Sequence, residues 1–131
     1  MGAIQSWRIF KIMAEFVTGF ELLSHYQLAA TIFGSARATS DDKAYRDAEI
    51  LSHKLAQGGF TIITGGAAGI MEAANRGAFK AGGHSVGVNI KLPSEQKGNN
   101  FTTDSEEFQH FFIRKTILSF ASEVYIFMPG G

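Results

Sequence analysis

Hydrophobic positions in the first thirty residues change from a helical spacing to a continuous run. Between Trp7 and Leu23, apolar side chains recur every three or four residues with charged residues between them. This spacing predicts an amphipathic helix. We expect it to pack on the domain rather than lie on a membrane, because basic residues do not dominate its polar face. Residues 28–33 form a continuous run of apolar and β-branched residues, which is typical of a central strand buried on both faces.

The remainder of the chain alternates between strand and helix patterns. Glycine pairs at 58–59 and 82–83 end the helical segments. We expect further strands at 60–64, 84–90 and 123–128, and helices from a cap at Ser40 or Asp41 to about 56, at 70–81 and at about 105–122. This alternation predicts a single doubly wound α/β domain over residues 1–131, with a mostly parallel, Rossmann-like sheet of four strands.

Composition narrows the choice of partners and compartment. The 12 basic residues balance the 12 acidic ones, so no overall charge favours nucleic acid or an anionic membrane. The chain has no cysteine, which excludes disulfides and thiolate metal sites and fits a reducing cytoplasm. The first helix carries charges where a signal peptide needs an apolar centre, so we expect a soluble cytoplasmic protein.

Three glycine-rich or polar stretches follow predicted strands. They are GSAR at 34–37, TGGAAGIME at 64–72 and PGG at 129–131. In a parallel sheet these ends share one edge, where ligands bind, so we expect the three stretches to converge. Gly65, Gly66 and Gly69 precede a helix, and their amides could hold a phosphate, although glycines at such a turn can also be purely conformational. Ser35 either caps the local turn or contacts that phosphate.

Several common sites do not fit the sequence. The glycine spacing is GGxxG, it follows the second strand, and no acidic residue ends the next strand, so a dinucleotide fingerprint fails. A Walker lysine and a GxSxG nucleophile elbow are also missing. The four histidines show no metal-ligand spacing, so we expect no metal. Arg114 and Lys115 lie on an aromatic-rich helical segment and either point into the crevice or reach from the helix surface to water.

Taken together, the motifs resemble the LONELY GUY family of phosphoribohydrolases. They are TIFGSAR, GFTIITGGAAGIMEAANRGAFKAGGHSVGVNI, LPSEQ, FFIRK and MPGG, in the family's order. The resemblance implies hydrolysis of a nucleoside 5′-monophosphate, such as AMP or a cytokinin riboside monophosphate, to the free base and ribose 5-phosphate. It implies no cofactor and a homodimer, to which we expect residues 108–120 to contribute. The alternative is a nucleotide-binding or sensing module without turnover.

The resemblance also assigns site residues. Arg114 matches the family's catalytic arginine, beside which Lys115 completes the RK pair. Glu72 matches a position lining the nucleotide site, or it complements the helix dipole. Gly130 and Gly131 begin the family's PGGxGTxxE motif, whose glutamate supplies the catalytic carboxylate. Because the sequence stops there, we expect a piece of a longer protein, cut after its fourth strand and inactive alone.

One departure from the family falls within the glycine turn. Ala67 and Ala68 stand where the family usually has Gly-Pro. An alanine forced to a positive φ would cost on the order of 1 kcal/mol, so we expect an altered phosphate cradle if either position needs that conformation.

Overall fold

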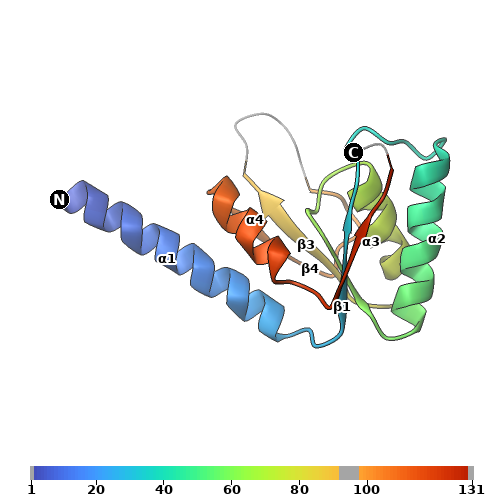
Figure 1. Cartoon of the computed structure of the whole chain (residues 1–131), viewed down its shortest axis with the longest axis horizontal. Helices are drawn as coiled ribbons and strands as arrows, with labels where there is room; N and C mark the ends of the chain where they lie inside the picture. The colour runs from blue at the N-terminus through green and yellow to red at the C-terminus, as the bar shows by residue number, and fades with distance from the viewer. Residues whose placement is uncertain (1, 92–97, 130–131) are drawn as a thin grey trace.

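A parallel sheet forms the middle layer of the computed structural model, which describes residues 2–91 and 98–129 (Figure 1). Its strand order is β4-β3-β2-β1-β5, and every neighbouring pair is parallel. The strands are β1 (Ala29–Phe33), β2 (Thr61–Thr64), β3 (Ser85–Ile90), β4 (Asp104–Phe108) and β5 (Val124–Phe127). The predicted α/β fold with a Rossmann-like parallel sheet is therefore confirmed.

Helices cover both faces of this sheet (Figure 1). They are α1 (Ala3–Ser24), α2 (Lys43–Gln57), α3 (Ile70–Lys80) and α4 (Phe111–Ser119). Successive residues of a strand point to opposite faces, so Ile62 packs beneath α2 and α3 while Ile63 packs beneath α1 and α4. The unbroken apolar runs of the central strands thus fill two cores, as expected for a doubly covered sheet.

The predicted helix at 105–122 is wrong over its first residues, because residues 104–108 form a strand. It is an edge strand whose residues pair in register with β3, from Val86 opposite Asp104 to Ile90 opposite Phe108. Its exposure alternates along the strand until Phe108, which is buried. Helix α4 begins only at Phe111, so β5 is the fifth strand of the chain rather than the fourth. Charged side chains are usual on an edge strand, and they obscured this one in the sequence.

The first helix is longer than predicted and only its carboxyl half rests on the domain. Its amino-terminal end extends away from the sheet (Figure 1). Glu15 attaches α1 to the start of α4. Its carboxylate accepts hydrogen bonds from the backbone N–H groups of Gln109 (2.7 Å) and His110 (3.3 Å), the two residues just before α4. None of the described helices is long and apolar enough to span a membrane.

A second tether follows the end of α1. The Tyr26 hydroxyl donates a hydrogen bond of 2.7 Å to the carboxylate of Asp104, at the start of β4. Burial and this bond raise the pKa of Tyr26 to about 12, so the hydroxyl stays protonated and remains a donor. The contact joins the α1–β1 connection to the far edge of the sheet.

Candidate functional site

Two of the three predicted stretches meet directly at the carboxyl edge of the sheet. The Ser35 carbonyl, after β1, accepts a 2.9 Å hydrogen bond from the N–H of Ile70, the first residue of α3. Gly69 has a φ of 75°, and a Cβ at this position would collide with the same Ser35 carbonyl oxygen. Glycine is therefore required here both for the backbone conformation and for the close approach of the two turns.

The glycine turn itself is more enclosed than the sequence suggested. Gly65, Gly66 and Gly69 are all buried, and Ala68 is the exposed residue between them. The N–H of Gly66 bonds to the Thr64 hydroxyl at 2.9 Å instead of facing the crevice. The turn's positive φ values belong to Gly66 and Gly69, whereas neither Ala67 nor Ala68 has one. The strain that we considered for the two alanines is therefore absent.

A buried polar network fixes this turn from below. Asn75 of α3 is fully buried, donates to the Ser85 hydroxyl at 2.8 Å, and accepts a 3.0 Å bond from the Asn99 side chain. The Asn99 side-chain amide also donates to the Ala67 carbonyl at 3.0 Å. The backbone N–H of Asn99 donates to the carbonyl of Gly66 at 2.8 Å. Sequence reasoning missed this network, because its bonds join residues as far apart as 32 positions.

Arg114 reaches the same edge from the opposite face of the sheet. Its Nε donates to the Val88 carbonyl of β3 at 2.8 Å, and its Nη2 donates to the Gly65 carbonyl at 3.2 Å. A side chain at Gly65 would collide with this guanidinium. Burial lowers the pKa of Arg114, which nevertheless remains a cation. Within the described part of the chain it forms no ion pair, so a desolvated positive charge sits where β2 and β3 end.

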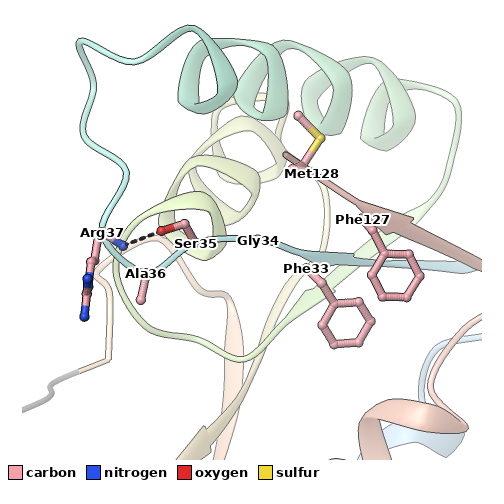
Figure 2. Close-up of a pocket in the computed structure, with 7 residues that line it drawn as sticks. All are labelled: Phe33, Gly34, Ser35, Ala36, Arg37, Phe127 and Met128. Atoms are coloured by element: carbon pink, nitrogen blue, oxygen red, sulfur yellow. Dashed lines mark hydrogen bonds between the residues drawn. The ribbon is translucent and has the colours of Figure 1, made fainter. Parts of the chain in front are cut away.

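Beside β1 the protein surface is hollowed. The open hollow, of about 690 Å³, is lined by Phe33, Gly34, Ser35, Ala36, Arg37, Phe127 and Met128 (Figure 2). The Ser35 hydroxyl accepts a 3.1 Å bond from the Arg37 N–H, so it caps the local turn. Figure 2 shows the rings of Phe33 and Phe127 side by side, with Met128 turned to the other side of the strands. The two rings are stacked, with centroids 5.1 Å apart.

The other predicted site residues lie apart from Arg114 or outside the described residues. Lys115 is exposed and lines a second hollow of about 390 Å³, which shares the rings of Phe33 and Phe127 with the first. Gly130 and Gly131 lie outside the described residues, as does the LPSEQ motif. Within residues 2–91 and 98–129, no group of three acidic or histidine side chains could hold a metal ion.

Glu72, in the first turn of α3, lies against helix α2. Its carboxylate accepts a 3.4 Å bond from the Tyr45 hydroxyl of α2, on the α2–α3 side of the sheet. Burial raises the pKa of Tyr45, a hydrogen bond with Arg76 lowers it, and the charge of Glu72 raises it again. The net direction is upward, so the hydroxyl remains a donor. The Glu72 carboxylate thus lies between α2 and α3.

Comparisons with known proteins bear on the family and the fold. The model of the family described as SLOG cluster4 (LDcluster4) matches residues 27–131. No curated protein matches the chain.

Several solved structures are similar in fold. The X-ray structure of TM1055 is 26% identical, with a TM-score of 0.65 over 77% of this chain and 60% of that one. The molybdenum cofactor binding protein from the phototrophic bacterium Rippkaea orientalis is 27% identical, with a TM-score of 0.68 over 80% and 64%. The molybdenum cofactor carrier protein from Chlamydomonas reinhardtii is 24% identical, with a TM-score of 0.67 over 80% and 64%. The chain thus spans less than two thirds of the length of these proteins.

Proposed function

The chain belongs to the SLOG cluster4 family, and from this premise we propose that it binds a phosphorylated, nucleotide-like ligand at the carboxyl edge of its sheet. The observation that carries the proposal is the guanidinium of Arg114, which is partly buried and bonded only to the carbonyls of Val88 and Gly65 among its described partners. A partly buried cation that forms no ion pair among the described residues attracts an anionic group.

The surrounding elements support an anion at this place. The amino-terminal end of α3 adjoins Gly65–Gly69, and its dipole adds positive potential close to Arg114. The polar network around Asn75 keeps the turn in one conformation, so a ligand need not order it. We infer that a phosphate would lie at the mouth of this turn, beside the exposed Ala68.

The hollow next to the turn suits a flat ring. Phe127 is 75% exposed although it stacks on Phe33, so one apolar ring face is open to a ligand. Aromatic side chains bind purine and related heterocycles by stacking, at about 1 to 3 kcal/mol per base. A ligand with a heteroaromatic ring and a phosphate would therefore contact both halves of the site.

As the activity, we propose hydrolysis of the N-glycosidic bond of a nucleoside 5′-monophosphate such as AMP or a cytokinin riboside monophosphate. Water would add to C1′ of the ribose as the bond to the base breaks, giving the free base and ribose 5-phosphate. The support is the family resemblance of the GSAR, GGAAGIME and RK motifs, together with membership of the SLOG cluster4 family. In this proposal Arg114 binds and orients the phosphorylated sugar.

Binding without turnover is the second candidate, and the printed names of two similar proteins favour it. Two of the similar proteins are a molybdenum cofactor binding protein and a molybdenum cofactor carrier protein. A phosphorylated pterin shares a fused ring and a phosphate with a nucleotide, so it is the competing ligand.

One titration series separates these functions. The chain is titrated with AMP, adenosine and molybdenum cofactor by calorimetry, and released adenine is followed by chromatography. We expect AMP to bind and adenosine to bind at least about tenfold more weakly, because the phosphate is absent. Release of adenine supports the hydrolase, whereas AMP binding without release supports the binding module. Failure to bind either phosphorylated ligand would overturn the proposal.

We further propose that the protein acts as a homodimer in the cytoplasm. Three phenylalanines of the α4 region, Phe111, Phe112 and Phe120, are more than half exposed. Such a concentration of exposed aromatic rings is typical of a protein–protein contact. Light scattering that shows only monomer at about 100 μM would contradict the homodimer.

A further inference from the structure

Two asparagines hold the carbonyl groups of the glycine turn. The Gly66 carbonyl accepts hydrogen bonds from the backbone N–H of Asn99 at 2.8 Å and from the side-chain Nδ2 of Asn89 at 3.3 Å. The Ala67 carbonyl accepts a 3.0 Å bond from the side-chain amide of Asn99. Two successive peptide groups of the turn are therefore fixed by contacts from β3 and from the segment before β4.

These contacts also fix the direction of two N–H groups. In a trans peptide, the C=O of one residue and the N–H of the next lie in one plane and point in opposite directions. Because the carbonyls of Gly66 and Ala67 point toward the asparagines, the N–H groups of Ala67 and Ala68 point away from them. Among the described residues, no atom accepts a hydrogen bond from either of these N–H groups. Two adjacent donors are thus left for another acceptor.

The turn decides the orientation of the Asn89 side chain. Its Oδ1 is buried and has no hydrogen-bond partner among the described residues. Exchanging the oxygen and the nitrogen would place two acceptors, Oδ1 and the Gly66 carbonyl, against each other. A buried acceptor without a partner destabilises a fold, whereas an apolar side chain would fill the same space without that penalty. The carboxamide of Asn89 therefore serves the turn rather than the core.

Three glycines leave room for this carboxamide. A Cβ at Gly66 or Gly87 would collide with the Asn89 Oδ1, and a Cβ at Gly98 would collide with its Nδ2. The side chain is therefore confined between the turn and β3. Confinement keeps its Nδ2 on the Gly66 carbonyl and so restrains the first peptide of the turn.

We propose that Asn89 and Asn99 are positioning residues of the ligand site. By holding two carbonyls of the turn, they present the N–H groups of Ala67 and Ala68 to the phosphate of the ligand. Successive N–H groups of this kind form concavities that bind anions. The inference rests on the proposed binding of a phosphorylated ligand, and it names the neutral donors that recognise the phosphate beside the cation of Arg114.

The donor at Ala68 is particular to this chain. Ala68 is exposed, so a ligand can reach it. It stands where the LONELY GUY family usually has proline, and proline has no backbone N–H. The turn of this chain therefore offers one more hydrogen-bond donor than the family's turn does.

Two substitutions remove the positioning contacts one at a time. Asn89→Leu keeps the branched shape of the side chain but loses the bond to the Gly66 carbonyl. Asn99→Ala loses the bond to the Ala67 carbonyl. In calorimetric titrations we expect each variant to bind AMP about three- to tenfold more weakly than the wild type, as for one lost hydrogen bond. Adenosine, which has no phosphate, should bind as before. The matched control is Asn100→Ala, at the exposed neighbouring asparagine, which should bind both compounds as the wild type does.

Stability distinguishes positioning from a purely structural role. Asn89→Leu removes a buried acceptor that has no partner, so we expect its midpoint of urea denaturation to equal or exceed that of the wild type while AMP binding weakens. A lower midpoint with an unchanged ratio of the AMP and adenosine dissociation constants would show that Asn89 supports only the fold. If the leucine variant does not fold, Asn89→Ala takes its place, with the same expected change in that ratio.

A separate pair of variants tests the donor itself. Ala68→Pro removes the N–H, and Ala68→Gly keeps it. We expect the proline variant to bind AMP at least about threefold more weakly than the glycine variant. In the wild-type chain, the amide resonances of Ala67 and Ala68 should shift on addition of AMP by more than that of Gly66, whose N–H is already bonded to Thr64.

The outcomes separate this inference from the ligand site. A wild-type chain that binds no phosphorylated ligand overturns both. Wild-type binding of AMP, with an unchanged preference for AMP over adenosine in Asn89→Leu and in Asn99→Ala, overturns the positioning role and leaves the ligand site standing. Equal AMP binding by Ala68→Pro and Ala68→Gly overturns the assignment of that N–H as a phosphate donor.

Discussion

At the scale of single residues, the site depends on close backbone approaches that leave no room for a side chain. Gly69 combines a positive φ with contact to the Ser35 carbonyl. We expect Gly69→Ala to lower the free energy of unfolding by about 2 kcal/mol or more, as the sum of backbone strain and displacement of the 34–37 turn. Urea denaturation measures this change. The control Ala68→Gly, at an exposed position without a positive φ, should change stability by less than about 1 kcal/mol. Equal effects would show that the turn does not need its glycine.

Arg114 is the residue whose removal should affect the ligand most. Its guanidinium is the desolvated cation at the ends of β2 and β3. We expect Arg114→Ala to weaken AMP binding at least about tenfold, because a charge-assisted contact to phosphate is lost. Arg8→Ala, which removes the same charge from the exposed part of α1, should leave the dissociation constant unchanged. If Arg114→Ala lowers the melting temperature but leaves AMP binding unchanged, Arg114 stabilises the fold and does not bind the ligand.

Site residues that belong to short sequence motifs were predicted. Residues whose role depends on contacts between distant parts of the chain were not. Arg114 and the glycines stand in local patterns of sequence. Asn75, by contrast, is an ordinary polar residue in a helix until Ser85 and Asn99 fold onto it. The predicted role of Glu72 stays a prediction, and the structure bonds its carboxylate to Tyr45.

At the scale of elements, α1 is attached by a charged contact that should depend on pH. Burial raises the pKa of Glu15, but hydrogen bonds from Gln109 and His110 lower it by more, so the folded-state pKa lies below the ordinary value. A lowered pKa means that the carboxylate stabilises the fold above the unfolded-state pKa, near 4.5, and that this contribution disappears as pH falls through the folded-state pKa.

The variant Glu15→Gln should make this dependence visible. At pH 7 we expect its free energy of unfolding to be about 1 to 2 kcal/mol lower than that of the wild type, because the charge-assisted bonds to the residues before α4 are weakened. The gap between the two proteins should narrow as pH falls below 4.5 and through the lowered folded-state pKa of Glu15, where the wild-type carboxylate becomes protonated. Urea denaturation at a series of pH values measures it. A gap that stays constant down to pH 3 would show that the charge of Glu15 does not matter.

Strands that are buried on both faces were predicted from the sequence. The edge strand β4, which is defined by its hydrogen bonds to β3, was not. The central strands β1 and β2 consist of apolar and β-branched residues that are nearly all buried, because both faces of the sheet are covered, so their type was readable from the sequence. The β4 segment Asp-Ser-Glu-Glu-Phe has no apolar run and becomes a strand through its ladder with β3. The predicted helix at 105–122 merged this strand with α4.

At the scale of the whole molecule, the proposed ligand site and the exposed part of α1 lie on separate surfaces. The carboxyl edge of the sheet gathers the turns after β1 and β2 together with Arg114, and it faces a small phosphorylated ligand. The amino-terminal end of α1 extends away from the sheet (Figure 1), and the side chains of Phe10, Met13 and Val17 on this helix are more than half exposed. Because no described contact links these side chains of α1 to Arg114, we expect changes in one to leave the other unaffected.

The measurement that tests the central claim most directly is a map of backbone amide chemical shifts as AMP is added to the isotopically labelled chain. Our account predicts that the amides of 34–37 and 65–72 shift with increasing AMP, and that adenosine at equal concentration shifts them far less. Amides on the outer surface of α2, around Ile50, should not move. Shifts confined to α2, or none at saturating AMP, would contradict a ligand site at the carboxyl edge of the sheet.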